Sequence, residues 1–193
     1  MERHSKTKAV FIDRDGTIVH HTKTFVVRLS QLRLFKFTPE AIQILNKAGF
    51  LVILITNQPV ISRGLMTPSE MDILHDGLFK RIARRGARVD ASYVCPHHPD
   101  GKIVPYGVKC LCRKPEPGLI LKAAKDYNVD LAKSFMVGDA LIDVVAGKRA
   151  GVKTIRVKTG PGHERLDKMY SDVEPDFVTN DMKSAAEIIN SVS

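Results

Sequence analysis

The stretch KAVFIDRDGTIV, residues 8–19, places two aspartates directly after an apolar run. The run is short and rich in branched side chains, as expected for a buried strand. Asp13 and Asp15 follow it one residue apart, and Gly16 and Thr17 come after them. Two carboxylates so close together resist joint ionisation unless a cation pairs with them. Oxygen ligands of this kind suit Mg²⁺. The simpler alternative is an ordinary turn after a strand, where Asp and Gly are common.

Strand-like and helical segments alternate along the rest of the chain. Short apolar runs predict further strands at residues 51–56, 91–95, 134–139 and 153–157. Amphipathic patterns between or after them predict helices at residues 38–50, 67–86, 115–129, 140–151 and 180–192. Thr38 and Thr67, each followed by a proline, are the expected N-caps of the first two helices. This alternation predicts a parallel sheet covered on both faces, which is the doubly wound α/β class.

Polar and charged residues stand where the predicted strands end, and ligands bind at that edge of a doubly wound sheet. Thr56 offers a hydroxyl and a backbone N–H to a phosphate oxygen, and Asp139 supplies a third carboxylate for a metal. Lys114 lies just before a predicted helix and can offset the charge of a transferring phosphoryl group. Asp143 either supports this site from outside the metal ligands or caps the helix that begins near Leu141.

The order of these motifs resembles that of the haloacid dehalogenase-like phosphohydrolases: D-x-D-G-T, a strand-ending Thr or Ser, a Lys, and G-D-x-x-x-D. The resemblance implies a Rossmann-like domain without a large cap. It implies that Asp13 is the nucleophile that forms an aspartyl-phosphate, and that Asp15 protonates the leaving alcohol and later activates water. Thr56 and Lys114 would hold the phosphoryl group. Mg²⁺ would be bound by Asp13, the main-chain carbonyl of Asp15, and Asp139.

Three cysteines and a histidine form a second group of metal-ligand residues. A C-x-H pair and a C-x-C pair, twelve residues apart, supply Cys95, His97, Cys110 and Cys112. Three thiolates and one imidazole are typical of a structural Zn²⁺ site. The odd number of cysteines argues against a disulfide framework, and the alternative is a set of reduced cysteines in an ordinary loop. His98 is the rival imidazole, and nothing local decides between the two histidines.

A loop of this kind at residues 95–112, directly before CRKP, is similar to one subfamily of these phosphohydrolases. That subfamily contains phosphatases of D-glycero-D-manno-heptose 1,7-bisphosphate and of histidinol phosphate, and the segments CPHHPDG and CRKPEPG look closer to the heptose enzymes. The similarity favours His97 as the zinc ligand. It also implies that Arg113, Asn57 and Gln58 contact the substrate.

Two segments depart from the pattern of the heptose enzymes. Those enzymes usually continue with Asn and an H-G-Y-V stretch that contacts the sugar, whereas this chain reads VHHTKTFV at residues 19–26. Pro59 and Val60 stand where Ser and Gly are common. The departures concern recognition of the sugar and leave the phosphoryl-transfer residues in place. We therefore expect an Mg²⁺-dependent phosphatase of a small sugar phosphate. The heptose bisphosphate is the leading substrate and histidinol phosphate the alternative.

The length, charge and composition of the chain limit the other classes of protein to which it can belong. The chain's 193 residues suit one domain, 1–193, and no apolar run approaches the roughly 18 residues of a membrane span. Because no signal peptide is recognisable, we expect a cytoplasmic monomer that does not bind membranes. The net charge of +9 favours an anionic partner and would suit a polynucleotide 3′-phosphatase. However, basic residues are scattered and aromatic residues make up only 6%, so nucleic acid is not the expected substrate.

A protein that only binds, with zinc for stability and an inactive phosphatase site, is the remaining alternative. It does not explain why all four motif positions carry reactive residue types. Hydrolysis is therefore the expected activity.

Overall fold

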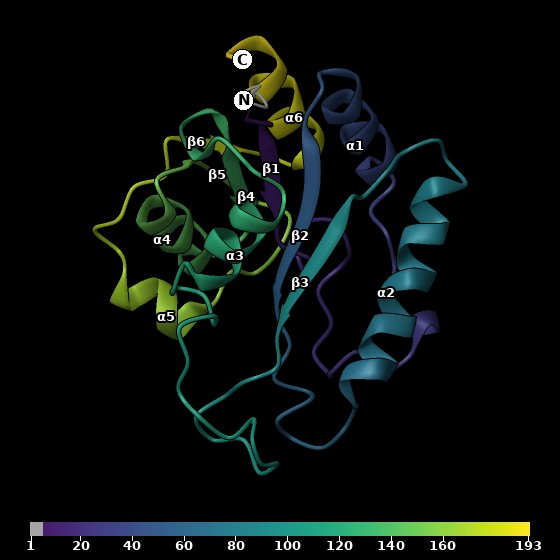
Figure 1. The fold of residues 1–193 in the computed structure, drawn as a ribbon, viewed down its shortest axis with the longest axis vertical. Coiled ribbons are helices and arrows are strands. Elements are labelled where there is room, and N and C mark those ends of the chain that lie inside the picture. The colour runs from purple at the N-terminus through teal and green to yellow at the C-terminus, as the bar shows by residue number, and fades with distance from the viewer. Residues whose placement is uncertain (1–5) are drawn as a thin grey trace, which may run out of the picture.

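Residues 6–193 are described by the structure, a computed structural model, and they contain a six-stranded sheet with helices on both faces (Figure 1). Every neighbouring pair of strands is parallel, and the strand order is β3-β2-β1-β4-β5-β6. The strands are β1 (Ala9–Ile12), β2 (Leu51–Asn57), β3 (Ala91–Cys95), β4 (Phe135–Gly138), β5 (Lys153–Val157) and β6 (Phe177–Thr179). This arrangement confirms the predicted doubly wound α/β class.

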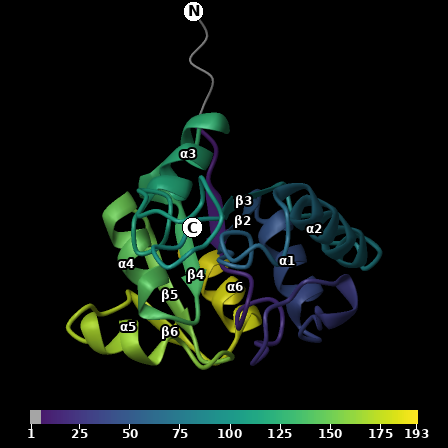
Figure 2. The ribbon, with the colours of Figure 1, turned by 90° about the horizontal axis from the view of Figure 1, so that it is seen from below.

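Helices divide between the two faces of the sheet, as the view from below shows (Figure 2). The helices are α1 (Thr38–Lys47), α2 (Pro68–Ala83), α3 (Gly118–Asp126), α4 (Leu141–Ala150), α5 (Glu164–Met169) and α6 (Met182–Ser191). Helices α1, α2 and α6 lie on one side, and α3 and α4 lie on the other with α5 beside α4. Side chains of β1 alternate between the two cores, because successive residues of a strand point to opposite faces: Val10 and Ile12 join one core, Ala9 and Phe11 the other.

All of the predicted strands and helices are present, whereas two further elements and one predicted helix cap differ from the expectation. Strand β6 and helix α5 escape sequence prediction because each is too short to show a hydrophobic period. Thr67 caps α2 as predicted: its hydroxyl accepts a hydrogen bond from the backbone N–H of Glu70 at 3.2 Å. The N-cap prediction for Thr38 is wrong. Its hydroxyl donates to the carbonyl of Ile18 at 2.7 Å, and Phe37 occupies the cap position.

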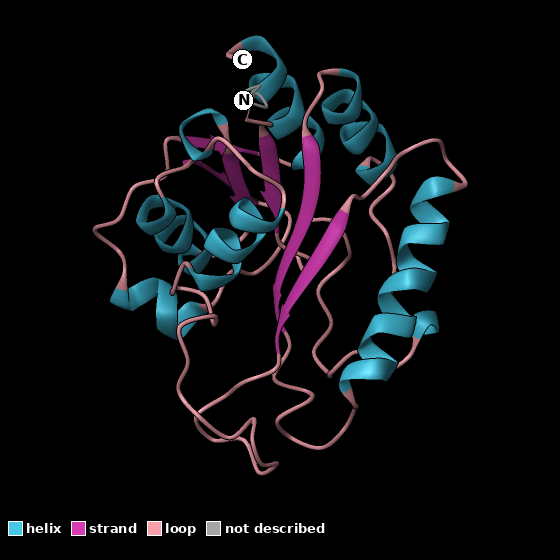
Figure 3. Cartoon of the chain, viewed as in Figure 1, coloured by secondary structure: helices cyan, strands magenta, loops and turns pink. Residues whose placement is uncertain are grey.

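The carboxyl ends of the strands lie at the lower edge of the sheet in Figure 1, and long loops, pink in Figure 3, gather there. The segment between β1 and α1, residues 13–37, contains only a short 3-10 helix at Leu29–Gln31. No cap domain is therefore inserted at that point. The segment between β3 and α3 contains the predicted zinc loop. Within residues 6–193, no helix combines the length and the apolar content that crossing a bilayer requires.

Candidate active site

The predicted phosphoryl-transfer residues meet at the carboxyl edge of the sheet, beside the two central strands. Asp13 follows β1, Asp139 follows β4, and Thr56 lies near the end of β2. Because β1 pairs in parallel with both β2 and β4, the ends of these strands converge. The three residues line a pocket of about 400 Å³ together with Arg113 and Lys114. The order of the strands reverses between β1 and β4, and doubly wound proteins bind ligands at such a point. The pocket lies at this point.

Lys114 is the cation that contacts the carboxylates of this pocket, and it is almost completely buried, at 3% exposure. Its Nζ lies 2.5 Å from Asp13 Oδ1 and 2.6 Å from Asp143 Oδ1, and it donates to the carbonyl of Ile55 at 2.9 Å. Burial alone would lower the pKa of Lys114, but the charges of Asp13 and Asp143 outweigh it and raise the pKa. The ammonium therefore stays charged at neutral pH.

Three carboxylates surround this single lysine. Asp13, Asp139 and Asp143 are buried, and each offers an oxygen within 4.8 Å of the others. Burial raises the pKa of Asp13 to about 7 despite the nearby Lys114, and burial together with the charge of Asp13 raises the pKa of Asp139 to about 8. When all three carboxylates are ionised, Lys114 offsets only one of their three negative charges. A buried set of carboxylate oxygens with this deficit fits a hard divalent cation such as Mg²⁺.

Two glycines leave room for the carboxylate of Asp139. Gly16 has a φ of 85°, and a Cβ at that position would lie 2.6 Å from Asp139 Oδ2. A Cβ on Gly160 would also overlap the Asp139 carboxylate. The backbone N–H of Gly162 donates to Asp139 Oδ2 at 2.9 Å. The glycine of the D-x-D-G-T motif therefore lets β1 and the Asp139 side chain approach closely.

Asp15 lies in the pocket but outside the three-carboxylate group. Its Oδ2 is 3.0 Å from Arg14 Nε, 2.8 Å from Arg14 Nη2 and 3.1 Å from Gln58 Nε2, and all three nitrogens are donors. The side chain is 27% exposed, so it remains accessible from the pocket. This placement suits a proton-transfer residue whose carboxylate is not a metal ligand.

Asn57, at the end of β2, and Gln58, directly after it, form hydrogen bonds that connect residues of the pocket. Gln58 Nε2 donates to Thr56 Oγ1 at 2.8 Å as well as to Asp15. Asn57 holds the main chain of Lys114: its Oδ1 accepts from the Lys114 N–H at 3.1 Å, and its Nδ2 donates to the Lys114 carbonyl at 3.0 Å. Asn57 and Gln58 line the pocket as predicted, and their amides also bond to the residues around it.

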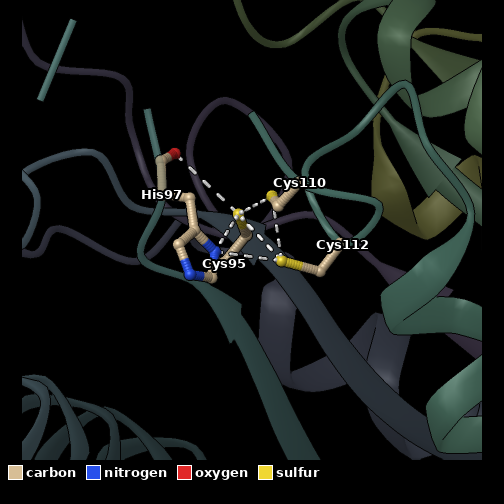
Figure 4. A group of neighbouring side chains, drawn as sticks. All are labelled: Cys95, His97, Cys110 and Cys112. Atoms are coloured by element: carbon tan, nitrogen blue, oxygen red, sulfur yellow. Dashed lines mark hydrogen bonds between the residues drawn. The ribbon is translucent and has the colours of Figure 1, made fainter. Parts of the chain in front are cut away.

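The four predicted zinc ligands form a compact group (Figure 4). Sγ of Cys95 lies 3.6 Å from that of Cys110 and 3.3 Å from that of Cys112, and Sγ of Cys110 lies 3.2 Å from that of Cys112. His97 Nδ1 lies 3.7 Å from Cys95 Sγ and 3.2 Å from Cys112 Sγ. Ligands about 2.3 Å from one tetrahedral Zn²⁺ stand about 3.8 Å apart, so the group fits zinc with a small expansion.

The rival imidazole points elsewhere, and no disulfide joins the three cysteines. His98 Nδ1 accepts from the backbone N–H of Asp100 at 3.1 Å and is not part of the ligand group. Directly after Cys112, Arg113 donates from Nη1 to the carbonyl of His97 at 3.3 Å. The zinc group therefore lies next to the pocket residues Arg113 and Lys114.

Several residues of the site are not among those the sequence singled out. Gly162 and His163, from the loop before α5, line the pocket and were not predicted; residues 21–26, which belong to the segment that departs from the heptose enzymes, line it too. Arg14 and His75 form a buried contact behind Asp15. The position of Arg14 between two motif aspartates could have drawn attention to it. No local pattern marks His75, which lies in the middle of an amphipathic helix.

Known proteins resemble this chain along most of its length. Residues 111–185 match the HAD-hydrolase-like family. The D-glycero-D-manno-heptose-1,7-bisphosphate 7-phosphatase of Chlorobaculum tepidum is 39% identical over 183 residues, which cover 92% of each chain. The D-glycero-beta-D-manno-heptose-1,7-bisphosphate 7-phosphatase of Escherichia coli K12 is 38% identical over 154 residues, which cover 79% of this chain and 80% of the relative.

A solved structure shares the fold as well as the sequence. The crystal structure of D,D-heptose 1,7-bisphosphate phosphatase from B. bronchiseptica, complexed with magnesium and phosphate, matches with a TM-score of 0.83 and 33% identity. The match covers 96% of this chain and 99% of that one. With the motif residues gathered at one pocket and relatives this similar over most of its length, the chain belongs to the haloacid dehalogenase-like hydrolases, in the family of the heptose-bisphosphate phosphatases.

Proposed function

We propose that this protein is an Mg²⁺-dependent phosphatase that converts D-glycero-D-manno-heptose 1,7-bisphosphate to the 1-phosphate. The observation that carries the proposal is the buried contact of Lys114 Nζ with Asp13 Oδ1, at 2.5 Å, beside two further carboxylates. A carboxylate held next to a fixed ammonium, in a pocket that also attracts a divalent cation, suits covalent phosphoryl transfer. The names of the relatives support this substrate.

Asp13 is the nucleophile in this mechanism. Its free carboxylate oxygen forms a bond to the phosphorus of the 7-phosphate while the bond from phosphorus to the sugar oxygen breaks. Asp15 donates a proton to that leaving oxygen, so that the sugar departs as an alcohol. Water then attacks the phosphorus of the aspartyl-phosphate, Asp15 accepts a proton from it, and the bond to Asp13 breaks to release phosphate.

The charges around the reacting phosphate have separate sources. Asp13, the main-chain carbonyl of Asp15, and Asp139 would hold Mg²⁺, which supplies positive charge to the phosphate oxygens when bound. Lys114 offsets negative charge on the transferring group. Thr56 presents its hydroxyl and its backbone N–H to a phosphate oxygen.

Asp143 acts from behind this set. Its Oδ1 pairs with Lys114, and its Oδ2 accepts from the backbone N–H of Ala140 at 3.2 Å, at the start of α4. We assign two roles to Asp143: it orients Lys114, and it caps the N-terminus of α4. Both sequence-based readings of Asp143 thereby find support in its contacts.

Substrate recognition is assigned to Arg113, Asn57 and Gln58. Arg113 presents a planar fork of donors that suits a second phosphate, whereas Asn57 and Gln58 contribute to the wall of the pocket. Cys95, His97, Cys110 and Cys112 would hold a structural Zn²⁺. Four protein ligands leave no open position for water, so zinc takes no part in the chemical step.

A panel of phosphate esters tests this proposal. We expect kcat/KM for the heptose 1,7-bisphosphate, assayed with Mg²⁺ and as both anomers, to exceed that for histidinol phosphate and for a 3′-phosphorylated oligonucleotide by more than about tenfold, a difference of about 1.4 kcal/mol in transition-state binding. A higher value for either of the other esters would overturn the substrate assignment.

We further propose that residues 1–193 act as a single domain, as a monomer, in the cytoplasm. Thiolate ligands persist best in a reducing compartment, which supports the location. Light scattering after size exclusion would measure the oligomeric state, and one cooperative unfolding transition is expected for a single domain. Cell fractionation would test the compartment.

A further inference from the structure

A buried chain of polar contacts runs from the helix α2 to the carboxylate of Asp15. Arg14 lies at its centre and is only 1% exposed. Arg14 Nε and Nη2 contact Asp15 Oδ2, as described above, while Nη1 contacts His75 Nε2 at 3.2 Å and Met71 Sδ at 3.6 Å. Gln58 closes the network, because its Oε1 accepts from Arg14 Nη2 at 2.9 Å and its Nε2 donates to Asp15 Oδ2.

His75 serves as a neutral acceptor in this network. It is 1% exposed, and burial together with the charge of Arg14 lowers the pKa of His75 to about 3. A guanidinium can only donate, so His75 Nε2 must accept and the ring proton must lie on Nδ1. Nδ1 is buried and has no hydrogen-bond partner among the residues that the structure describes. A residue needed only for packing would not leave a polar atom unsatisfied, since leucine fills similar space.

Three of these donors contact one oxygen of Asp15. Nε and Nη2 of Arg14 and Nε2 of Gln58 donate to Oδ2, and the Asp15 side chain is 27% exposed in the pocket. Three donors on Oδ2 disfavour a proton there. The proton that Asp15 exchanges is thereby directed to Oδ1.

We propose that His75 and Arg14 are positioning residues, which hold the Asp15 carboxylate so that Oδ1 exchanges the proton with the leaving oxygen. The inference rests on the proposed function through the acid role of Asp15. Without an acceptor at position 75, Arg14 Nη1 has no partner on α2 that is more than a weak sulfur acceptor, and the guanidinium can turn away from Oδ2. Asp15 then loses its fixed orientation, although the charge of Arg14 remains.

The choice of leaving group separates positioning from a merely structural role. A sugar alkoxide is a poor leaving group and needs a proton as the ester bond breaks. The p-nitrophenolate ion is stable and leaves without one. Loss of acid catalysis therefore slows hydrolysis of the sugar phosphate but not that of p-nitrophenyl phosphate, whereas a disturbed fold slows hydrolysis of both. The ratio kcat/KM reports the step that releases the alcohol, so the later hydrolysis of the aspartyl-phosphate does not mask the difference.

The experiment compares the heptose bisphosphate with p-nitrophenyl phosphate in five variants. We expect His75→Leu to lower kcat/KM about 10- to 100-fold for the bisphosphate and less than about threefold for p-nitrophenyl phosphate. A positioned acid contributes about 10²–10⁴-fold to the rate, and the variant should lose part of that contribution. His75→Gln should restore most of the activity because its amide oxygen can accept from Arg14. Leu78→Ala, on the same buried face of α2, should affect both substrates equally. Arg14→Lys provides a second test of the network if His75→Leu does not fold.

The fifth variant, Asp15→Asn, separates a failure of the proposed function from a failure of the positioning role. If Asp15→Asn slows both substrates equally, the acid role of Asp15 is wrong, and this inference falls with it. If Asp15→Asn discriminates between the substrates but His75→Leu and Arg14→Lys slow both equally or not at all, the positioning role is overturned and the proposed function stands. Discrimination by all three variants, with rescue by His75→Gln, would support the assignment.

Discussion

Asn57 holds Lys114 by both of its main-chain groups, with hydrogen bonds of 3.1 Å to the N–H and 3.0 Å from the side-chain amide to the carbonyl. Asn57 ends β2, whereas Lys114 follows the zinc loop. The reciprocal pair therefore fastens the lysine of the active site to the sheet. Nζ of the same lysine reaches Asp13, so the position of the main chain sets the position of the charge.

Asn57→Ala should lower both activity and stability. Loss of two hydrogen bonds is expected to cost about 1–3 kcal/mol of unfolding free energy, and kcat should fall because Lys114 is less well placed. Asn46→Ala is a matched control, since Asn46 makes the same reciprocal pair with the main chain of Arg88, at 2.8 and 3.1 Å, away from the pocket. Denaturant unfolding and steady-state kinetics would measure both. Equal kcat in the two variants would contradict a role for the Asn57 pair in catalysis.

Asp13→Asn should abolish turnover and preserve the fold. An amide cannot attack phosphorus as a carboxylate does, and Asn has nearly the same shape, so Lys114 keeps an oxygen partner. Turnover with Mg²⁺ and thermal unfolding would check this prediction, and trapping of a phosphorylated protein after acid quench should succeed only in the wild type. Wild-type turnover in the variant would exclude the covalent mechanism.

Arg113→Ala should raise KM for the bisphosphate about 10- to 150-fold, because a charged hydrogen bond contributes about 1.5–3 kcal/mol. A monophosphate that lacks the distal group should be much less affected. Arg149→Ala is the control, since Arg149 pairs with Glu116 outside the pocket and should leave both KM values unchanged. Equal losses for both esters would show that Arg113 does not bind a second phosphate.

Zinc should be present at one equivalent per chain, and its binding should depend on His97 and not on His98. His97→Ala removes one of four ligands, whereas His98→Ala removes a side chain that bonds to the backbone of Asp100 outside the ligand group. Metal analysis of protein purified without chelator would show the difference. Activity should fall in His97→Ala through displacement of Arg113 and Lys114. Zinc-free wild-type protein with reduced thiols would contradict the site.

In the metal-free protein, Asp13 and Asp139 should lower the free energy of unfolding as the pH rises from about 4 to about 8, against an opposite contribution from buried His75, whose pKa is lowered to about 3. Burial raises the pKa of Asp13 to about 7 and that of Asp139 to about 8, both above the ordinary value of 3.8, so the folded state binds more protons in this window. Each carboxyl then contributes a slope of at most about −1.4 kcal/mol per pH unit. Asp139→Asn should flatten the profile.

Added Mg²⁺ should consequently stabilise the wild type more at pH 8 than at pH 5, because binding favours the ionised carboxylates. Thermal unfolding across this range, with and without Mg²⁺, measures both effects. Identical pH profiles for the metal-free wild type and Asp139→Asn would contradict the buried carboxylate cluster.

Local pattern in the chain was enough to predict which residue types end the central strands, and in what order. Asp13, Thr56 and Asp139 each close an apolar run, and parallel strands necessarily bring such positions to one edge of the sheet. The three cysteines of the zinc group were equally predictable, because two tight pairs of ligands carry their own local geometry. These inferences needed only short-range pattern and the rule that links strand ends to ligand sites, whereas the choice of His97 over His98 depended on the family resemblance.

The tertiary structure alone decided how the side chains behind those residues are used. The pairing of Arg14 with His75 joins residues 61 positions apart and depends on how α2 packs against the sheet. The hydrogen bond from the Thr38 hydroxyl to the carbonyl of Ile18, which replaces a helix cap, likewise depends on how the segment between β1 and α1 folds. Such choices follow from which buried donors and acceptors need partners in the assembled core, and no local pattern in the chain encodes that balance.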